Sequence, residues 1–481
     1  MSPAPAGQHQ RHARGRQRPE ERATRIGWPV WRLAWVIVFG AFASGLDASL
    51  ANIGLHAIAA DLHADLDQVQ WVASGYLLAL AVSLPACGWL GRKAGVGRLW
   101  LAALAGFTAA SGLCAAAPTI GMLIGVRVGQ GLAAGVLIPA GQTILGQAVG
   151  PGRLGRVMST LGMAVSLAPA IGPVVGGVVL HWLAWQWLFL LNLPIGAAGL
   201  ALGWRLVPRG EAGQAAKLDW LALICASAGL ALVVYALTTW GSTGDFLSPT
   251  VLATLALGAG SIGLFVRRSR RADALLDLRL YRNRVYTAAS AAAGFTGAVV
   301  FGSPLLFPLY FQLLHHDQVI GTGLRVLALG IGTAIGVPAA GRLTDRYGGG
   351  RVAVAGTLAL VAFTVPFAFL SAAANPVLIE ELLLVLGMAT GLAAVPPGIA
   401  AYTAVTRHQL PDATTGVNII QRLGGALGAA MFAVVLARGL PAGVQHAFHA
   451  AFWWQAGAAV AALGCALWLW LALRHDRASP S

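Results

Sequence analysis

Long apolar stretches alternate with short polar gaps along almost the whole chain. Each stretch holds roughly 18–26 residues, about the length that an α-helix needs to cross a bilayer. The pattern therefore predicts an all-α, polytopic membrane protein. We count fourteen stretches, at residues 31–54, 70–90, 99–117, 119–141, 157–180, 186–206, 219–239, 249–266, 287–312, 319–341, 352–372, 376–400, 415–437 and 450–473.

Basic residues occupy every second gap between these stretches. The region up to residue 32, the even-numbered gaps and the C-terminal tail together hold 28 of the 32 Lys and Arg residues. Lys and Arg are retained on the cytoplasmic side of a membrane, whereas acidic residues carry little topological weight. Both termini are therefore predicted to be cytoplasmic, in agreement with an even number of spans.

Composition and charge narrow the class further. Hydrophobic residues make up 57% of the 481 residues and charged residues 10%, with a formal net charge of +15. Because the cations are spread over short loops that face an anionic leaflet, the charge indicates membrane topology and not nucleic-acid binding. Residues 1–30 are polar and Arg-rich, without the apolar core of a secretory signal, and are predicted to form a disordered cytoplasmic tail. The four cysteines lie far apart, so neither a disulfide framework nor a metal site is expected.

An internal sequence repeat predicts the domain organisation. The string GWLGRKAGVGR at 88–98 returns as GRLTDRYGGGR at 341–351, with glycines at matching offsets. The repeated string predicts two six-span halves related as parallel repeats. The alternative is that basic, Gly-rich turns are ordinary on cytoplasmic loops. The predicted division is a tail at 1–30, an N-terminal bundle at 31–206, two additional helices with linkers at 207–286, a C-terminal bundle at 287–473 and a tail at 474–481.

Further segments follow one another in a recognisable order: LDASLANIGLHAIAADL at 46–62, WVASGYLLALA at 71–81, RVGQGLAAG at 127–135, APAIGPVVGG at 168–177, WQWLFLLNLPIG at 185–196 and IIQRLGGALGAA at 419–430. Together with the repeated loop string they resemble the major facilitator superfamily. The 6+2+6 layout of fourteen spans resembles its drug:proton antiporter branch. The resemblance covers nearly the whole chain after residue 30, and it implies export driven by a proton gradient, without a cofactor.

Two opposite charges lie at one depth in the predicted membrane. Asp47 is roughly 10 Å and Arg127 about 12 Å below the outer boundary at 1.5 Å per residue, and Gln130 lies one turn from Arg127. An ionisable residue inside a span is a functional candidate, because burying charge in hydrocarbon is costly. The alternative is an ion pair that only fixes helix register. The resemblance matches Asp47 to the acidic position of the first-span motif and Arg127 to the arginine tied to proton coupling.

Other span residues are candidates for a substrate cavity. Glu380 and Glu381 begin the twelfth span and, as adjacent helical positions, point about 100° apart. Two alternatives stay open: one of them attracts a cationic substrate or takes a second proton, or both extend into outer-leaflet water. Arg325 and Arg422 also lie within spans and are assigned to interface or ion-pair roles. The uncharged candidates, each of which could instead make an interhelical hydrogen bond, are Asn52, Tyr76, Asn192, Gln312, Asn418 and Gln421.

Conformational change is assigned to the fifth span and the second loop string. Prolines remove backbone donors and glycines allow close helix approach, which makes Pro169, Gly172, Pro173, Gly176 and Gly177 candidate hinge residues. The resemblance implies that an acid in the loop string latches one conformation by pairing with basic groups.

The two copies of the loop string differ at the latch position. The second copy keeps Asp345 and Arg346, but the first has Arg92 where the family usually has an acid. A weakened gate, a compensating partner and altered coupling all stay open.

These observations predict a proton-coupled exporter of amphipathic, lipophilic or cationic compounds, with Asp47 exchanging its proton against substrate. An exporter of one metabolite or lipid precursor is the alternative, and a membrane glycosyltransferase is a weaker one. The expected partners are a small-molecule substrate and the lipid bilayer, for a monomer that an accessory periplasmic protein could join. Abundant Arg, Ala and Gly with only two lysines suggest a GC-rich bacterial genome, and hence the bacterial cytoplasmic membrane.

Overall fold

The computed structural model describes residues 26–149, 151–210, 213, 218–269, 275–316, 318–371 and 374–478. Within these ranges the regular structure is entirely helical. Thirteen described helical segments are long and apolar enough to cross a membrane, and α6 is a further helix of 29 residues. The prediction of an all-α protein with many membrane-spanning helices is confirmed.

The helices follow the predicted apolar stretches but often extend beyond them, because backbone hydrogen bonds continue a helix past the apolar layer. The sixth stretch is divided at Leu191 into α7 and α8. In chain order the elements are α2 (Trp28–Asp61), α3 (Leu66–Ala94), α4 (Val96–Ala115), α5 (Ile120–Ala148), η1 (Pro151–Arg153), α6 (Leu154–Trp182), α7 (Trp187–Leu190), α8 (Asn192–Leu206), α9 (Trp220–Thr243), α10 (Pro249–Arg268), η2 (Leu278–Arg282), α11 (Arg284–Leu314), α12 (Val319–Tyr347), α13 (Gly349–Thr364), η3 (Val365–Ala368), α14 (Pro376–Thr403), α15 (Leu410–Gly439), η4 (Leu440–Ala442) and α16 (Val444–Ala478).

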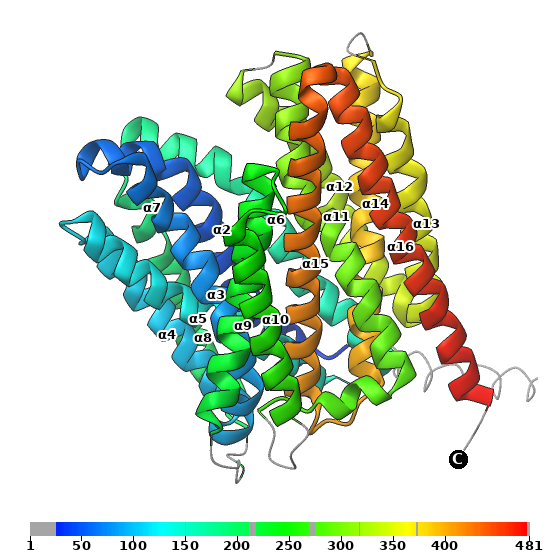
Figure 1. The fold of residues 1–481 in the computed structure, drawn as a ribbon. Coiled ribbons are helices and arrows are strands. Elements are labelled where there is room, and N and C mark those ends of the chain that lie inside the picture. The colour runs from blue at the N-terminus through cyan, green and yellow to red at the C-terminus, as the bar shows by residue number, and fades with distance from the viewer. Residues whose placement is uncertain are drawn as a thin grey trace, which may run out of the picture.

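Two groups of helices lie side by side in Figure 1, in blue to teal and in light green to red. We call α2–α8 the N-terminal bundle and α11–α16 the C-terminal bundle. The bundles meet along two seams, where α3 packs against α15 and α6 against α12. Helices α9 and α10 pack on each other, and α9 contacts both α3 and α15. The α9–α10 pair therefore covers one seam and leaves the other uncovered.

Two glycines end corresponding helices of the two bundles in the same way. Gly95 follows α3 with φ 86° and ψ 131°, and Gly348 follows α12 with φ 87° and ψ 147°. A positive φ is strained for residues with a side chain, so glycine suits both turns. These glycines occupy matching positions of the repeated string, and the backbone therefore repeats along with the sequence.

Arginines mark one end of the molecule. The ends of helices that carry Arg92, Arg156 and Arg346, and the loop that carries Arg407, gather there, as the contacts between them described below require. We call it the basic end and the other the opposite end. At the opposite end the Thr119 hydroxyl accepts a hydrogen bond from Met122 N at 3.3 Å and caps α5. This cap fixes where α5 begins, and so the depth of Arg127 two turns further on.

Candidate functional site

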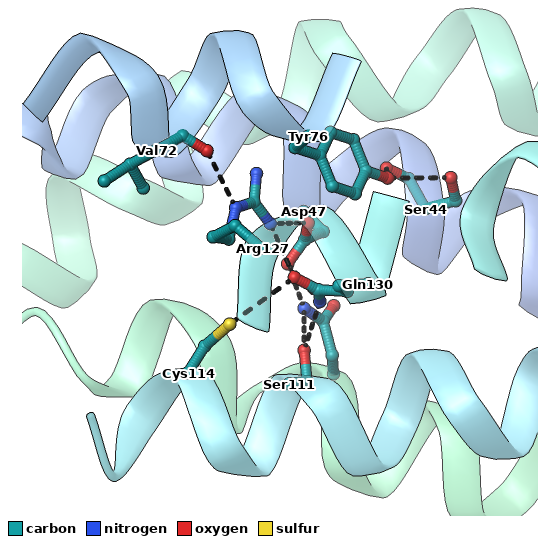
Figure 2. Close-up of polar contacts among 9 residues, drawn as sticks. Ser44, Asp47, Val72, Tyr76, Ser111, Cys114, Arg127 and Gln130 are labelled. Carbon is teal, nitrogen blue, oxygen red and sulfur yellow. Dashed lines mark hydrogen bonds and ion pairs between the residues drawn. The ribbon is translucent and has the colours of Figure 1, made fainter. Parts of the chain in front are cut away.

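A polar cluster lies buried within the N-terminal bundle (Figure 2). Asp47 of α2 and Arg127 of α5 form an ion pair in which Arg127 Nη1 donates to Asp47 Oδ2 at 2.5 Å. Their side chains are 1% and 0% exposed. Gln130, one turn along α5, accepts from Arg127 Nη1 through Oε1 at 2.7 Å and donates from Nε2 to Asp47 Oδ1 at 3.1 Å. The structure thus brings together Asp47, Arg127 and Gln130, which counting residues along the predicted spans had placed at similar depths in the membrane.

Two further side chains complete the cluster around the carboxylate. Asn192 at the start of α8 donates from Nδ2 to Asp47 Oδ1 at 2.7 Å. The Ser111 hydroxyl of α4 accepts from Asn192 at 3.0 Å and from Gln130 at 2.8 Å. Asp47 therefore accepts hydrogen bonds from three side chains, those of Arg127, Gln130 and Asn192. Four helices contribute to this cluster, so it also fixes their positions relative to one another.

The Arg127 side chain is held on its remaining sides by backbone and aromatic rings. Its Nε donates to the Val72 carbonyl of α3 at 3.0 Å, and its guanidinium carbon lies 4.1 Å from the centre of the Tyr76 ring and 5.5 Å from that of Phe189. Tyr76 donates from its hydroxyl to the Ser44 carbonyl at 3.1 Å. Arg127 Nη2 is buried without a hydrogen-bond partner. An arginine so enclosed loses most of its hydration and depends on Asp47 for its charge balance.

The remaining cavity candidates lie apart from this cluster. Asn418 of α15 is buried and donates to Gln142 Oε1 of α5 at 2.7 Å, so it joins the two bundles. The Gln421 backbone packs closely against Gly297 within the C-terminal bundle. Four other candidates are exposed, and they are Asn52, Gln312, Glu380 and Glu381.

The predicted hinge residues lie in α6, which is one continuous helix. Gly172 lies against the side chain of Ser49, and Gly176 against Leu50 and Ile53, so both allow α2 and α6 to pack closely. Gly177 faces open space. The side chains of Pro169 and Pro173 lie outside the described part of the chain.

The second loop string forms an inter-bundle contact at the basic end. Asp345 of α12 accepts from the backbone N–H groups of Gly155 at 2.8 Å and Arg156 at 3.2 Å, and from Arg156 Nε at 3.0 Å. We call this set the Asp345 latch. Arg346 instead lies over the ring of Tyr347, 5.2 Å from its centre, and is exposed. The basic partner of Asp345 is therefore Arg156 at the start of α6.

The first loop string makes a corresponding contact with the charges exchanged. Arg92 of α3 pairs with Asp412 in the first turn of α15, and its Nη2 donates to the Leu275 carbonyl at 3.1 Å. We call this pair the Arg92 latch. The sequence left open a weakened gate, a compensating partner and altered coupling for Arg92. Asp412 is such a compensating partner.

Sequence reasoning missed Ser111 and Asp412. Serine in an Ala-rich span is common, because its hydroxyl can bond its own helix backbone, so Ser111 gave no signal. Asp412 fell outside the hydropathic stretch counted from residue 415, although an acid directly after Pro411 is typical of a first helical turn.

Side-chain bonds between the two bundles gather toward the basic end. Besides the two latches they include Thr143 with Thr414 at 2.8 Å, and Gln142 with Asn418 and Tyr402. Arg407 also donates to the Gln147 carbonyl. The bundles are therefore fastened at the basic end in this conformation. In the described part of the chain, no group of three His, Cys, Asp or Glu side chains is placed to hold a metal.

Comparison with known proteins gives a family and relatives. A profile of the Major Facilitator Superfamily matches residues 37–429. The chain is 32% identical over 428 residues to the multidrug resistance protein B homolog of Mycobacterium tuberculosis strain H37Rv, covering 88% of this chain and 79% of the relative. It is 28% identical over 415 residues to the putative multidrug resistance protein MdtD of Cronobacter sakazakii, covering 84% and 86%.

Solved structures share the fold at low sequence identity. The human organic anion transporter MFSD10 superposes with a TM-score of 0.61 at 16% identity, covering 92% of this chain and all of that one. The proton:xylose symporter XylE gives a TM-score of 0.63 at 13% identity, covering 92% and 95%. At such identities the likeness concerns the arrangement of helices alone.

Proposed function

The chain belongs to the major facilitator superfamily, and on that premise we propose that it exports amphipathic or lipophilic small molecules in exchange for protons. A member of this family is a secondary transporter and not an enzyme, which removes the glycosyltransferase alternative. Relatives named as multidrug resistance proteins support export. The observation that carries the proposal is the carboxylate of Asp47, paired with Arg127 where both side chains are almost completely buried.

The proposed topology has fourteen spans in the bacterial cytoplasmic membrane, with both termini and the basic end facing the cytoplasm. Bacterial relatives and the distribution of Lys and Arg support it. With the bundles fastened at the basic end, the conformation described here corresponds to one closed toward the cytoplasm. Alternating access then requires the latches to open as the contacts at the opposite end form.

Proton exchange at Asp47 requires movement of the surrounding helices. A proton added to the carboxylate removes the charge that balances Arg127, and a lone buried guanidinium is strongly unfavourable. Protonation therefore favours any conformation in which α2 and α5 separate enough to hydrate Arg127. Deprotonation favours the bonded state seen here. One carboxylate can in this way link the proton gradient to the two conformations.

The test uses inverted vesicles with an imposed pH gradient and a fluorescent lipophilic probe, for wild type and Asp47→Asn. We expect Asp47→Asn to abolish gradient-driven accumulation of the probe while leaving downhill exchange in place. Asp61→Asn is the matched control on the same helix, because Asp61 lies outside the cluster and accepts a bond from Trp185 Nε1 at 2.7 Å. The proposal is contradicted if Asp47→Asn vesicles still accumulate the probe and continue to do so after the pH gradient is collapsed.

A second variant separates coupling from folding. Removing one partner of a buried ion pair costs about 3–5 kcal/mol, so Asp47→Asn alone also lowers thermal stability. The double variant Asp47→Asn with Arg127→Gln removes both charges, and we expect its melting temperature to recover. Gradient-driven accumulation should stay lost. Recovery of accumulation together with stability would assign the pair a purely structural role.

A further inference from the structure

An arginine outside the buried cluster lies deep in the interface between the bundles. Arg422 is twelve residues into α15, about 18 Å from the basic end at 1.5 Å per residue. It is one turn beyond Asn418, which bonds to α5 across the interface. The helix that carries it, α15, packs against both α3 and α5 of the other bundle. Arg422 therefore lies on the face of α15 that carries Asn418, near mid-membrane depth and further from the basic end than the fastened contacts.

This cation has no counter-charge in the described part of the chain. No carboxylate there forms an ion pair with Arg422, and no hydrogen bond holds its guanidinium, although the side chain is partly exposed. The buried acids Asp47 and Asp412 are engaged elsewhere, since Asp47 pairs with Arg127 and Asp412 with Arg92. Glu380 lies at the start of α14, near the opposite end. Sequence analysis left interface and ion-pair roles open for Arg422, and the described part of the chain offers it no ion-pair partner.

The surroundings of Arg422 combine charge with apolar surface. One turn further along α15, Gly425 packs against the ring of Phe301, a residue that is 44% exposed. An unpaired charge at mid-membrane depth is costly unless a partner or water compensates it. A ligand with an anionic group and an apolar body would satisfy both features.

We propose that Arg422 is a substrate-binding residue that pairs with a carboxylate, sulfonate or phosphate group on an amphipathic substrate. This inference rests on the proposed export function and narrows its substrates to lipophilic anions, in place of the cations suggested by sequence. Proton exchange at Asp47 and substrate binding at Arg422 then use different side chains on different bundles.

Binding is measured first, because it needs no proton gradient. Purified protein in nanodiscs is titrated with 1-pyrenebutyrate, its neutral methyl ester and the corresponding pyrenebutyl ammonium ion, using quenching of the sixteen tryptophans. We expect wild type to bind the acid about tenfold more tightly than the ester or the ammonium ion, as a charge-assisted contact provides. Arg422→Gln should remove this preference, and Arg422→Lys should retain part of it.

Arg438→Gln is the matched control, because Arg438 lies on the same helix near the opposite end and donates to the Gly244 carbonyl. It should keep the preference for the acid, and partition of the probes into lipid is the same for every variant. The inference is overturned if wild type binds the acid no more tightly than the ester, or if Arg422→Gln keeps the preference. Transport of the same acid in vesicles tests export separately. Binding that depends on Arg422 without gradient-driven transport would reject the proposed function and leave the inference standing.

Discussion

The two latches at the basic end occupy equivalent places in the two bundles but carry opposite charges. In the Asp345 latch the loop string supplies the acid and α6 supplies Arg156, its third residue. In the Arg92 latch the loop string supplies the base and α15 supplies Asp412, also its third residue. The first glycine of each string lies against the receiving helix, Gly88 at Asp412 and Gly341 at Gly155.

Both latches place a carboxylate at the N-terminus of the receiving helix. A helix N-terminus presents unpaired N–H groups and partial positive charge, so it favours a carboxylate. In each latch one carboxylate lies at the start of the receiving helix, whether it comes from that helix or from the loop. Since α15 already contains its acid, the loop there must supply a cation. The two therefore differ when they open, because α6 loses its carboxylate whereas α15 keeps Asp412.

The largest expected effect comes from Asp345→Ala. This change removes three bonds to the start of α6 and should favour opening of the basic end by about 3 kcal/mol. Spin labels at positions 98 and 347, both exposed at the basic end, report the separation by double electron–electron resonance in a background without the four cysteines. Arg346→Ala is the neighbouring control and should leave the distances unchanged. An unchanged distribution in Asp345→Ala would show that this latch does not hold the bundles.

A smaller effect is expected from Arg92→Ala. The ion pair and the bond to the Leu275 carbonyl are lost, but Asp412 stays at the start of α15. We therefore expect the free energy of opening the basic end to fall by about 1–2 kcal/mol. The same spin-label pair measures it. Lys93→Ala is the control, because Lys93 is exposed and lies over Trp89 at 4.6 Å. If Arg92→Ala opens the basic end more than Asp345→Ala does, the proposed inequality of the latches is wrong.

The smallest net effect is expected when the charges of the Arg92 latch are exchanged. Arg92→Asp and Asp412→Arg should each disrupt the contact by placing like charges together. The double variant recreates the charge order of the Asp345 latch, so it should recover most of the closed population. Distance distributions for wild type, both single variants and the double variant give the coupling energy directly. Additive losses would mean that the two side chains do not act as a pair.

Sequence patterns predicted the helical class and the spans because hydropathy reports the apolar layer that each helix must match. Depth counted along α2 and α5 placed Asp47 beside Arg127 in advance of any structure, although the roles of these residues stay predictions. The bonds from Asn192 and Ser111 could not be foreseen, since they depend on how α8 and α4 rotate about their axes. Asp412 was overlooked for a different reason, because a polar first turn is invisible to a hydropathy count.

The α9–α10 pair makes the two seams unequal in their surroundings. Helix α9 is bonded to α3 through Ser227, whose hydroxyl donates to the Val82 carbonyl at 2.7 Å, and to α15 through Arg438 and the Gly244 carbonyl. Protein therefore flanks the seam of α3 and α15. In a bilayer, lipid acyl chains would flank the seam of α6 and α12, which the α9–α10 pair does not cover. Bilayer thickness and chain order consequently act most directly on the seam that contains the Asp345 latch.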